Sequence, residues 1–271
     1  MVFGLLYDSQ GVQKNTSPTF NIFKLINCLL LIVGQGGGLT RLILTLQNEE
    51  YFHFPDKHDI QGMIYTALGT SEFADAHDDT GFKYFTYSDL FYDRCGRSTL
   101  IVSSPNPRFI EQILDWTEQQ EFIQLGKDRY DIECARVFEP CLERKFISGS
   151  PIILYLDSKS GEYFSFKHHG DISFFLDRLK DNALKKYEFY TGTRVYLNEP
   201  LFDEVKLRRE FAVPVKIHGA ELVFIGTMWN SLVKEDIQKE EAFYRFLMET
   251  GLGEKNSLGF GFINPVRSRL Q

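Results

Sequence analysis

The stretch GLGEKNSLGFG, residues 251–261, follows a predicted helix, precedes a predicted final strand and contains four glycines, Gly251, Gly253, Gly259 and Gly261. A glycine has no Cβ, so it adopts positive φ and lets the backbone approach another surface at little cost. Gly251 alone fits the residue that ends a helix, but that explanation does not extend to all four. The stretch therefore predicts a backbone loop that lies closely against something else.

Two nucleotide-binding patterns can be tested on this loop, and both fail. The dinucleotide pattern needs a third glycine where Asn256 stands, and the phosphate-loop pattern needs Lys and then Ser or Thr where Phe260 and Gly261 stand. Both patterns also need a strand before the loop and a helix after it, which is the reverse of the order predicted here. A nucleotide-binding enzyme is therefore disfavoured.

Upstream of the loop, one order of elements is predicted twice. In residues 60–68 the apolar side chains recur at i, i+3, i+4, i+7 and i+8, which is typical of an amphipathic helix. Asn106 and Pro107 indicate the beginning of a second helix. The β-rich runs of this first copy are residues 41–46, 82–87, 99–103 and 121–125. Residues 41–140 are thus predicted to follow the order β-α-β-β-α-β.

The second copy follows a predicted linker at residues 137–149. Its β-rich runs are residues 151–156, 211–217, 221–228 and 258–263, and its helical runs are residues 171–187 and 234–250. The predicted fold class is α+β, with two tandem ferredoxin-like (RRM-like) β-α-β-β-α-β domains, residues 41–140 and 150–271. The glycine-rich loop comes directly before the last strand of the second domain.

Residues 1–40 differ from the rest of the chain. Their apolar run, residues 20–33, is interrupted by Asn21, Lys24 and Asn27 and is well below the roughly 20 residues that span a bilayer. We expect residues 1–40 to be an extension outside the fold, from a start codon assigned too early. No association with a membrane is predicted.

Composition limits the function classes. The net charge of -7 and the pI near 5.5 are unusual for a protein that binds a nucleic acid backbone. A local basic patch is sufficient for such binding, however, and pairs such as Lys185-Lys186 are present. Taken singly, each pair is better explained as ordinary solvated charge. The four cysteines and six histidines show no metal-ligand spacing, so neither a metal nor another cofactor is predicted. Reduced thiols indicate a cytoplasmic protein.

The glycine-rich loop closely resembles that of the repeat-associated mystery proteins of CRISPR systems, and its part EKNSLGFG resembles the CRISPR-associated endoribonucleases of Cas family number six. The resemblance extends to Gln61-Gly62-Met63-Ile64-Tyr65, to His77 after that helix, and to the strand that Lys83 opens, KYFTY. The segment between Tyr65 and His77 is a few residues shorter than in the best-known members. From the residues alone, Tyr65, His77 and Lys83 are better explained as an edge tyrosine and two surface residues, and it is the resemblance that favours a catalytic site.

The resemblance implies a metal-independent endoribonuclease that cuts CRISPR repeat RNA by attack of a 2′-hydroxyl, leaving a 2′,3′-cyclic phosphate. It implies that Tyr65 and His77 act as the general acid and the general base, and that Lys83 stabilises the phosphorane. Histidine is the side chain best suited to proton transfer, because its ordinary pKa of about 6.5 is near neutral pH. The alternative from another class is a non-catalytic RNA-binding subunit of a CRISPR effector complex, which has no need of these three residues.

The resemblance also implies where RNA would bind, namely along the second domain and the groove between the domains. The residues expected to contact RNA are Lys206, Arg208, Arg209, Lys216 and Lys255. The expected partners are the repeat RNA and subunits of a CRISPR effector complex, and a homodimer is a further expectation.

Overall fold

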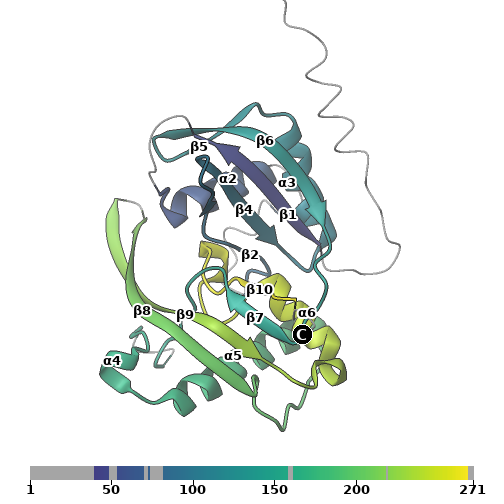
Figure 1. The fold of residues 1–271 in the computed structure, drawn as a ribbon, viewed down its shortest axis with the longest axis vertical. Coiled ribbons are helices and arrows are strands. Elements are labelled where there is room, and N and C mark those ends of the chain that lie inside the picture. The colour runs from purple at the N-terminus through teal and green to yellow at the C-terminus, as the bar shows by residue number, and fades with distance from the viewer. Residues whose placement is uncertain are drawn as a thin grey trace, which may run out of the picture. The chain divides into compact units, whose positions relative to one another are not determined.

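The computed structural model describes residues 40–48, 54–69, 73, 82–157, 161–217 and 219–267. These residues belong to one compact unit that runs from Gly34 to Gln271. Residues 1–39, nearly all of the predicted extension, lie outside the described residues, and so does His77. Figure 1 shows the described part as two α/β halves that follow one another along the chain.

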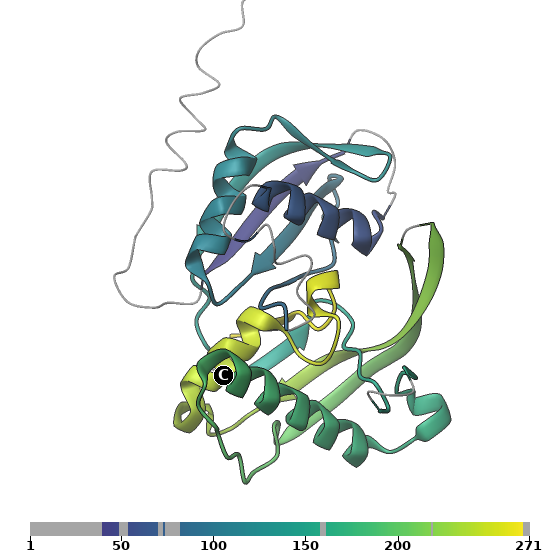
Figure 2. The ribbon, with the colours of Figure 1, turned by 180° about the vertical axis from the view of Figure 1, so that it is seen from behind.

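The first half is an antiparallel sheet covered on one face by two helices (Figure 2). Its sheet order is β2-β4-β1-β6-β5, and β3 pairs with β4. The strands are β1 (Arg41–Gln47), β2 (Thr86–Tyr87), β3 (Phe91–Tyr92), β4 (Arg97–Ser103), β5 (Phe122–Leu125) and β6 (Asp128–Phe138). The helices are α2 (Lys57–Leu68), which Asp56 caps through a capping box, and α3 (Pro107–Glu118), which Asn106 caps as predicted.

The second half repeats the arrangement with the sheet order β10-β7-β9-β8. Its strands are β7 (Lys145–Ser148), β8 (Glu204–Ile217), β9 (Ala220–Val233) and β10 (Ile263–Pro265). Its helical elements are α4 (Phe166–His169), α5 (Ile172–Thr191), η2 (Ile237–Glu240), α6 (Glu241–Thr250) and η3 (Asn256–Leu258). In both halves the last strand of the motif lies beside the first, and the third lies between the first and the second. The predicted tandem ferredoxin-like fold is confirmed.

Two strand predictions in the first half were wrong. The strand that pairs with the central β1 is β6, whereas the predicted fourth strand, residues 121–125, became the outer strand β5 of a hairpin with β6. The sequence DRYDIECARVF of β6 carries many charges because much of the strand is exposed or half-buried, and this weakened its apolar signal. The predicted strand at residues 82–87 is reduced to β2, because only Thr86 and Tyr87 pair with β4.

In the second half, several boundaries differ from the prediction, and β8 and β9 are longer than the predicted runs 211–217 and 221–228. The predicted linker contains β7, which is one of the two inner strands of the second sheet. Residues 151–156 form only two isolated bridges, Ile152 with Thr227 and Tyr155 with Tyr163. The predicted helix at residues 234–250 is divided between η2 and α6. The predicted strand at residues 258–263 is mostly loop, because Gly259 and Gly261 adopt φ values of 75° and 77°, outside the extended region.

A buried arginine joins the two halves. Arg41, the first residue of β1, is inaccessible to solvent and donates to Asn264 Oδ1 (2.7 Å), to the carbonyl of Met248 (2.6 Å) and to that of Ile263 (2.9 Å). Its guanidinium also lies 4.6 Å from the centre of the Phe262 ring. Burial lowers the pKa of Arg41 to about 9. These contacts attach the first strand of one half to the last strand of the other.

Candidate active site beside the glycine-rich loop

The glycine-rich loop between α6 and β10 is closed on itself by buried hydrogen bonds. The amide of Leu252 donates to the carbonyl of Gly261 (2.8 Å), and the Asn256 side chain donates to the carbonyls of Leu252 (3.0 Å) and Phe260 (2.9 Å). A Cβ on Gly261 would lie 1.9 Å from the Leu252 carbonyl oxygen. The glycine there is therefore required by this closure.

Lys186, on α5, is hydrogen-bonded to the glycine-rich loop. Its ammonium is completely buried and donates to the carbonyls of Gly251 (2.9 Å) and Gly253 (3.3 Å) and to the side-chain oxygen of Asn256. Burial lowers the pKa of Lys186 to about 7, against a smaller opposing effect of Glu254. Sequence reasoning saw this lysine only as half of a basic pair, because nothing local distinguishes it from the exposed Lys185.

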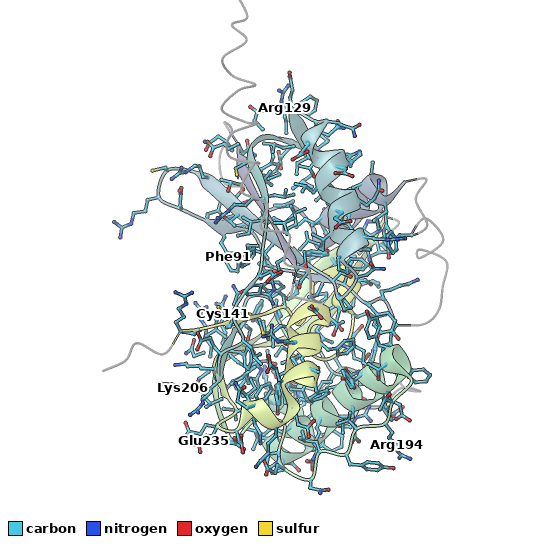
Figure 3. The ribbon with its side chains drawn as sticks, turned by 90° about the vertical axis from the view of Figure 1, so that its right-hand side faces the viewer. Phe91, Arg129, Cys141, Arg194, Lys206 and Glu235 are labelled. Atoms are coloured by element: carbon cyan, nitrogen blue, oxygen red, sulfur yellow. The ribbon has the colours of Figure 1, made fainter. Side chains whose placement is uncertain are left out.

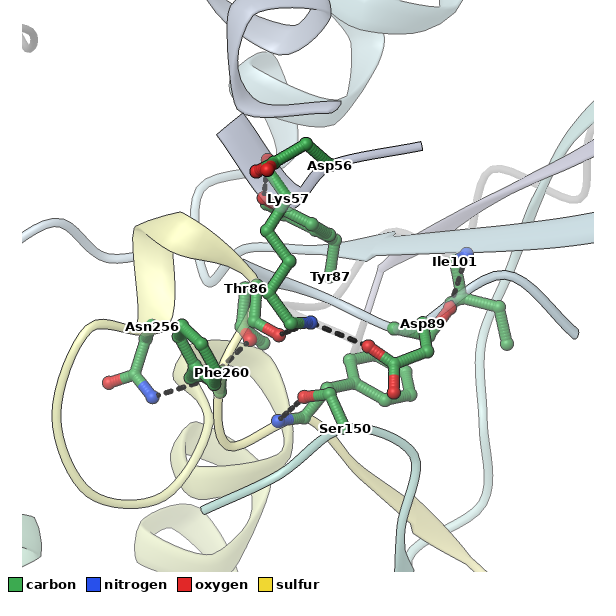
Figure 4. A network of polar contacts seen from close by, with 12 residues as sticks. Asp56, Lys57, Thr86, Tyr87, Asp89, Ile101, Ser150, Asn256 and Phe260 are labelled. Carbon is green, nitrogen blue, oxygen red and sulfur yellow. Dashed lines mark hydrogen bonds and ion pairs between the residues drawn. The ribbon is translucent and has the colours of Figure 1, made fainter. Parts of the chain in front are cut away.

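The other side of the loop lies against the first half. Lys57 donates to the Gly259 carbonyl (2.8 Å), is paired with Asp89 (2.5 Å) and lies 4.8 Å from the Phe260 ring centre (Figure 4). The Tyr87 hydroxyl donates to the Lys57 carbonyl (2.5 Å). Sequence reasoning missed Lys57, although a cation in the first turn of a helix is electrostatically unfavourable and could have marked it.

Tyr65 projects from α2 toward the loop. Its hydroxyl is hydrogen-bonded to the Ser257 side chain, and Gln61, one turn earlier, donates to the Ser257 carbonyl (3.0 Å). The Tyr65 ring meets Phe85 edge-on, with centroids 6.0 Å apart. Burial raises the pKa of Tyr65 above its ordinary value, and the bond to Ser257 opposes this shift. The tyrosine is thus a protonated, oriented hydroxyl at neutral pH.

Lys83 lies in the segment that leads into β2, between the two halves. Its neighbours alternate in direction: Phe85 packs against Tyr65 and Phe109 in the first half, whereas Tyr84 packs against Tyr190 in the second, with centroids 4.8 Å apart. Because side chains alternate along an extended segment, Lys83 is expected on the side of Phe85 and Tyr65. The structure thus brings Tyr65 to the glycine-rich loop and Lys83 to the adjoining segment, and His77 is not described.

The five predicted RNA-contacting residues are exposed but do not form one patch. Lys206, Arg208, Arg209 and Lys216 are all on β8, where Arg208 falls within a register shift. At about 3.3 Å per residue, Lys206 and Lys216 are roughly 30 Å apart along the strand. Lys216 is near the first half, because its amide donates to the Asp56 carboxylate (2.7 Å). Lys255 is in the glycine-rich loop, 5.8 Å from the centre of the Tyr155 ring.

A separate cavity of about 560 Å³ lies between α4 and β8. Its lining includes Glu162, His168, His169 and Glu210, and Glu210 accepts hydrogen bonds from Ser165 and Phe166 at the beginning of α4. Among the residues that the structure describes, no group of three or more His, Cys, Asp or Glu side chains is arranged to hold a metal ion. Within the same residues, no helix has the length and apolarity to cross a membrane.

Comparison with known proteins gives one consistent result. The family described as CRISPR associated protein Cas6, C-terminal, matches residues 139–265. CRISPR-associated endoribonuclease Cas6 2 of Methanocaldococcus jannaschii is 39% identical over 240 residues, which are 84% of this chain and 100% of that protein.

Solved structures agree in fold. One described as CRISPR associated protein Cas6 has a TM-score of 0.63 at 23% identity, over 84% of this chain and 100% of the other. Another, described as an RAMP protein binding different RNA substrates, has a TM-score of 0.61 at 16% identity, with the same coverage. At these identities the two structures support the fold alone.

Proposed function

The chain belongs to the Cas6 family of CRISPR-associated endoribonucleases, and we propose that it cuts repeat RNA in CRISPR precursor transcripts by a metal-independent transesterification. The observation that carries this proposal is the 39% identity to a named Cas6 endoribonuclease over that protein's whole length. The position of Tyr65, held by Ser257 of the glycine-rich loop, supports the proposed placement of the chemistry.

In the proposed reaction, the 2′-oxygen attacks the adjacent phosphorus, a new P–O2′ bond forms and the P–O5′ bond breaks. A base takes the proton of the 2′-hydroxyl, an acid protonates the departing 5′-oxygen, and the products end in a 2′,3′-cyclic phosphate and a 5′-hydroxyl. We assign the indispensable proton transfer to His77. We assign stabilisation of the negatively charged phosphorane to the Lys83 ammonium.

Tyr65 is proposed to orient or donate rather than to act as a base. A base must lose its proton near neutral pH, and burial moves the pKa of Tyr65 in the opposite direction. Its hydrogen bond to Ser257 and its edge contact with Phe85 set the direction of the hydroxyl. The glycine-rich loop then acts through Tyr65, by presenting Ser257 at a defined place.

RNA binding is proposed to involve Lys206, Arg208, Arg209, Lys216 and Lys255. Because these cations extend along β8 and into the loop, they fit successive phosphates of an extended strand better than one phosphate group. Each single substitution to alanine is expected to weaken binding modestly and to reduce its salt dependence. Attachment to effector subunits and homodimer formation stay predictions, which gel filtration with and without repeat RNA would test.

The deciding experiment uses repeat RNA labelled at its 5′ end, the wild-type protein and His77→Ala, all in EDTA. We expect the wild type to cut at one position and leave a 2′,3′-cyclic phosphate, and His77→Ala to bind the RNA nearly as well without cutting it. Strict dependence on Mg²⁺ would contradict the proposed mechanism. Binding without cleavage by the wild type would favour the non-catalytic RNA-binding subunit.

A further inference from the structure

A ladder of aromatic rings leads from the core of the second half to the surface beside Lys83. Its inner end is Phe246 on α6, which is 3% exposed. Tyr84 and Tyr190 pack against Phe246 with centroids 6.3 and 5.1 Å away, and they lie 4.8 Å from each other. These contacts connect the segment before β2 to the last turn of α5.

The outer end of the ladder is unusually exposed for aromatic side chains. Phe189 on α5 is 74% exposed, although its ring lies 5.6 Å from that of Phe82. Tyr190 is 41% exposed. We name Phe82, Phe189 and Tyr190 the aromatic platform. Tyr190 packs on the buried Phe246 ring, whereas Phe189 contacts only the half-buried Phe82 ring. A ligand that covers Tyr190 therefore restricts that side chain little further on binding.

The platform is surrounded by cations, together with the exposed carboxylate of Glu188, which directly precedes Phe189. Lys185 is exposed one helical turn before Phe189, and Arg194 follows the end of α5. Lys83 is next to Phe82 in the chain, but its side chain is expected on the opposite side of the segment, with Phe85 and Tyr65. Figure 3 shows Arg194 and Lys206 on opposite sides of the second half, so Arg194 does not belong to the basic residues of β8. Burial raises the pKa of Glu249, the acidic group that acts on Tyr190, to about 8.

We propose that the aromatic platform stacks unpaired nucleotides of the RNA substrate next to the cleavage position. Nucleobases have apolar faces that stack on aromatic rings whatever the sequence, and neighbouring cations hold the phosphates. Tyr84 directs its ring to the platform side of the segment, whereas Phe85 faces Tyr65. A strand that crosses this segment therefore has one nucleotide at the platform and a following phosphate at Tyr65 and Lys83. The inference rests on the proposed function for the identity of the RNA.

The test measures binding separately from cleavage. The probe is the repeat RNA of the CRISPR array in the source genome, with a 2′-deoxy nucleotide at the cleavage position and 2-aminopurine at each unpaired position in turn, because stacking on an aromatic ring quenches this base. The proteins are the wild type, Phe189→Ala, Phe189→Trp and Phe189→Leu. The matched control is Phe174→Ala, which removes another partly exposed phenylalanine of the same helix.

We expect Phe189→Ala to weaken RNA binding by about 5- to 140-fold, the range for loss of one stacked base. Phe189→Ala should also abolish the quenching of 2-aminopurine fluorescence at one or two positions of the RNA. Phe189→Trp should restore both, Phe189→Leu should restore neither, and Phe174→Ala should resemble the wild type. The thermal midpoint of Phe189→Ala should stay near that of the wild type, because the ring is mostly exposed.

Unchanged affinity in Phe189→Ala, or restoration by Leu as complete as by Trp, would overturn the platform. Equal loss in Phe174→Ala would do the same, since it would indicate a general effect on the helix. If Phe189→Ala instead lost only the capture of a protein subunit, the platform would be a protein-binding surface and the proposal would be wrong. Absence of cleavage of the all-ribose RNA would refute the proposed function alone, because the binding data come from the uncleavable probe.

Discussion

Replacing Gly259 by alanine tests the close approach of the glycine-rich loop to the first half. Gly259 has a φ of 75°, and a Cβ there would lie 2.1 Å from Cε2 of Tyr87. Tyr87 cannot retreat easily, because it is fully buried and its hydroxyl donates to the Lys57 carbonyl. The left-handed conformation costs a non-glycine residue about 1–2 kcal/mol, and overpacking of this kind costs about 1–3 kcal/mol more. The expected loss of unfolding free energy is thus about 2–5 kcal/mol.

The matched control is Gly192→Ala at the end of α5. Gly192 also has a left-handed conformation, with a φ of 66°, but a Cβ there would meet nothing within 4 Å. It should therefore show the conformational cost of about 1–2 kcal/mol alone. Urea unfolding followed by circular dichroism measures both variants. If Gly259→Ala were no less stable than Gly192→Ala, the contact with Tyr87 would not constrain the loop, and the reasoning would be refuted.

Three further predictions concern buried groups and the candidate site. The pKa of Lys186 is about 7 in the folded chain and about 10.4 in the unfolded chain. Between these pH values the unfolded state holds a proton on Lys186 that the folded state has lost, so the free energy of unfolding of the wild type should increase from pH 7 to 10. Lys186→Met should remove that gain in urea unfolding at several pH values, and an unchanged slope would contradict the assignment. Burial raises the pKa of Glu249 from 4.5 to about 8, so between these pH values the folded state holds a proton that the unfolded state has lost. The free energy of unfolding should therefore decline as pH rises over that interval. Glu249→Gln should make this decline smaller. Tyr65→Phe keeps the packing against Phe85 but loses the hydrogen bond to Ser257. Single-turnover cleavage should slow by about 100-fold or more, while the thermal midpoint should change little. A normal cleavage rate would exclude Tyr65 from the reaction.

Elements that carry their own local signals were predicted well. The apolar spacing of α2, the Asn106 cap of α3 and the helical run of α5 depend on residues within a few positions of each other, and the structure has all three helices. Strand β6 and strand β7 were missed for the same reason. Their place in the sheets is determined by partners far away in the chain, such as β1 for β6 and β10 for β7.

The candidate site also has features that the sequence predicts and features that only the structure shows. The spacing of Gln61, Tyr65 and Lys83 and the four glycines could be read directly, together with the family that they resemble. The contacts of the loop could not be predicted from the sequence, because Lys57, Tyr87 and Lys186 reach it from elements that are 65 to more than 200 residues away in the chain. Their side chains look like ordinary surface cations and a core tyrosine until the chain is folded.

The sequence by itself therefore determined the family, the repeated β-α-β-β-α-β order and the loop that had to lie against another surface, since each depends on short-range patterns. Only the tertiary structure decided that this surface is the first half, with Gly259 against Tyr87, and that one of two adjacent lysines, Lys186, is buried beneath the loop. Burial and hydrogen bonding are properties of all the elements packed around a residue. For GLGEKNSLGFG, those elements come from both halves of the chain.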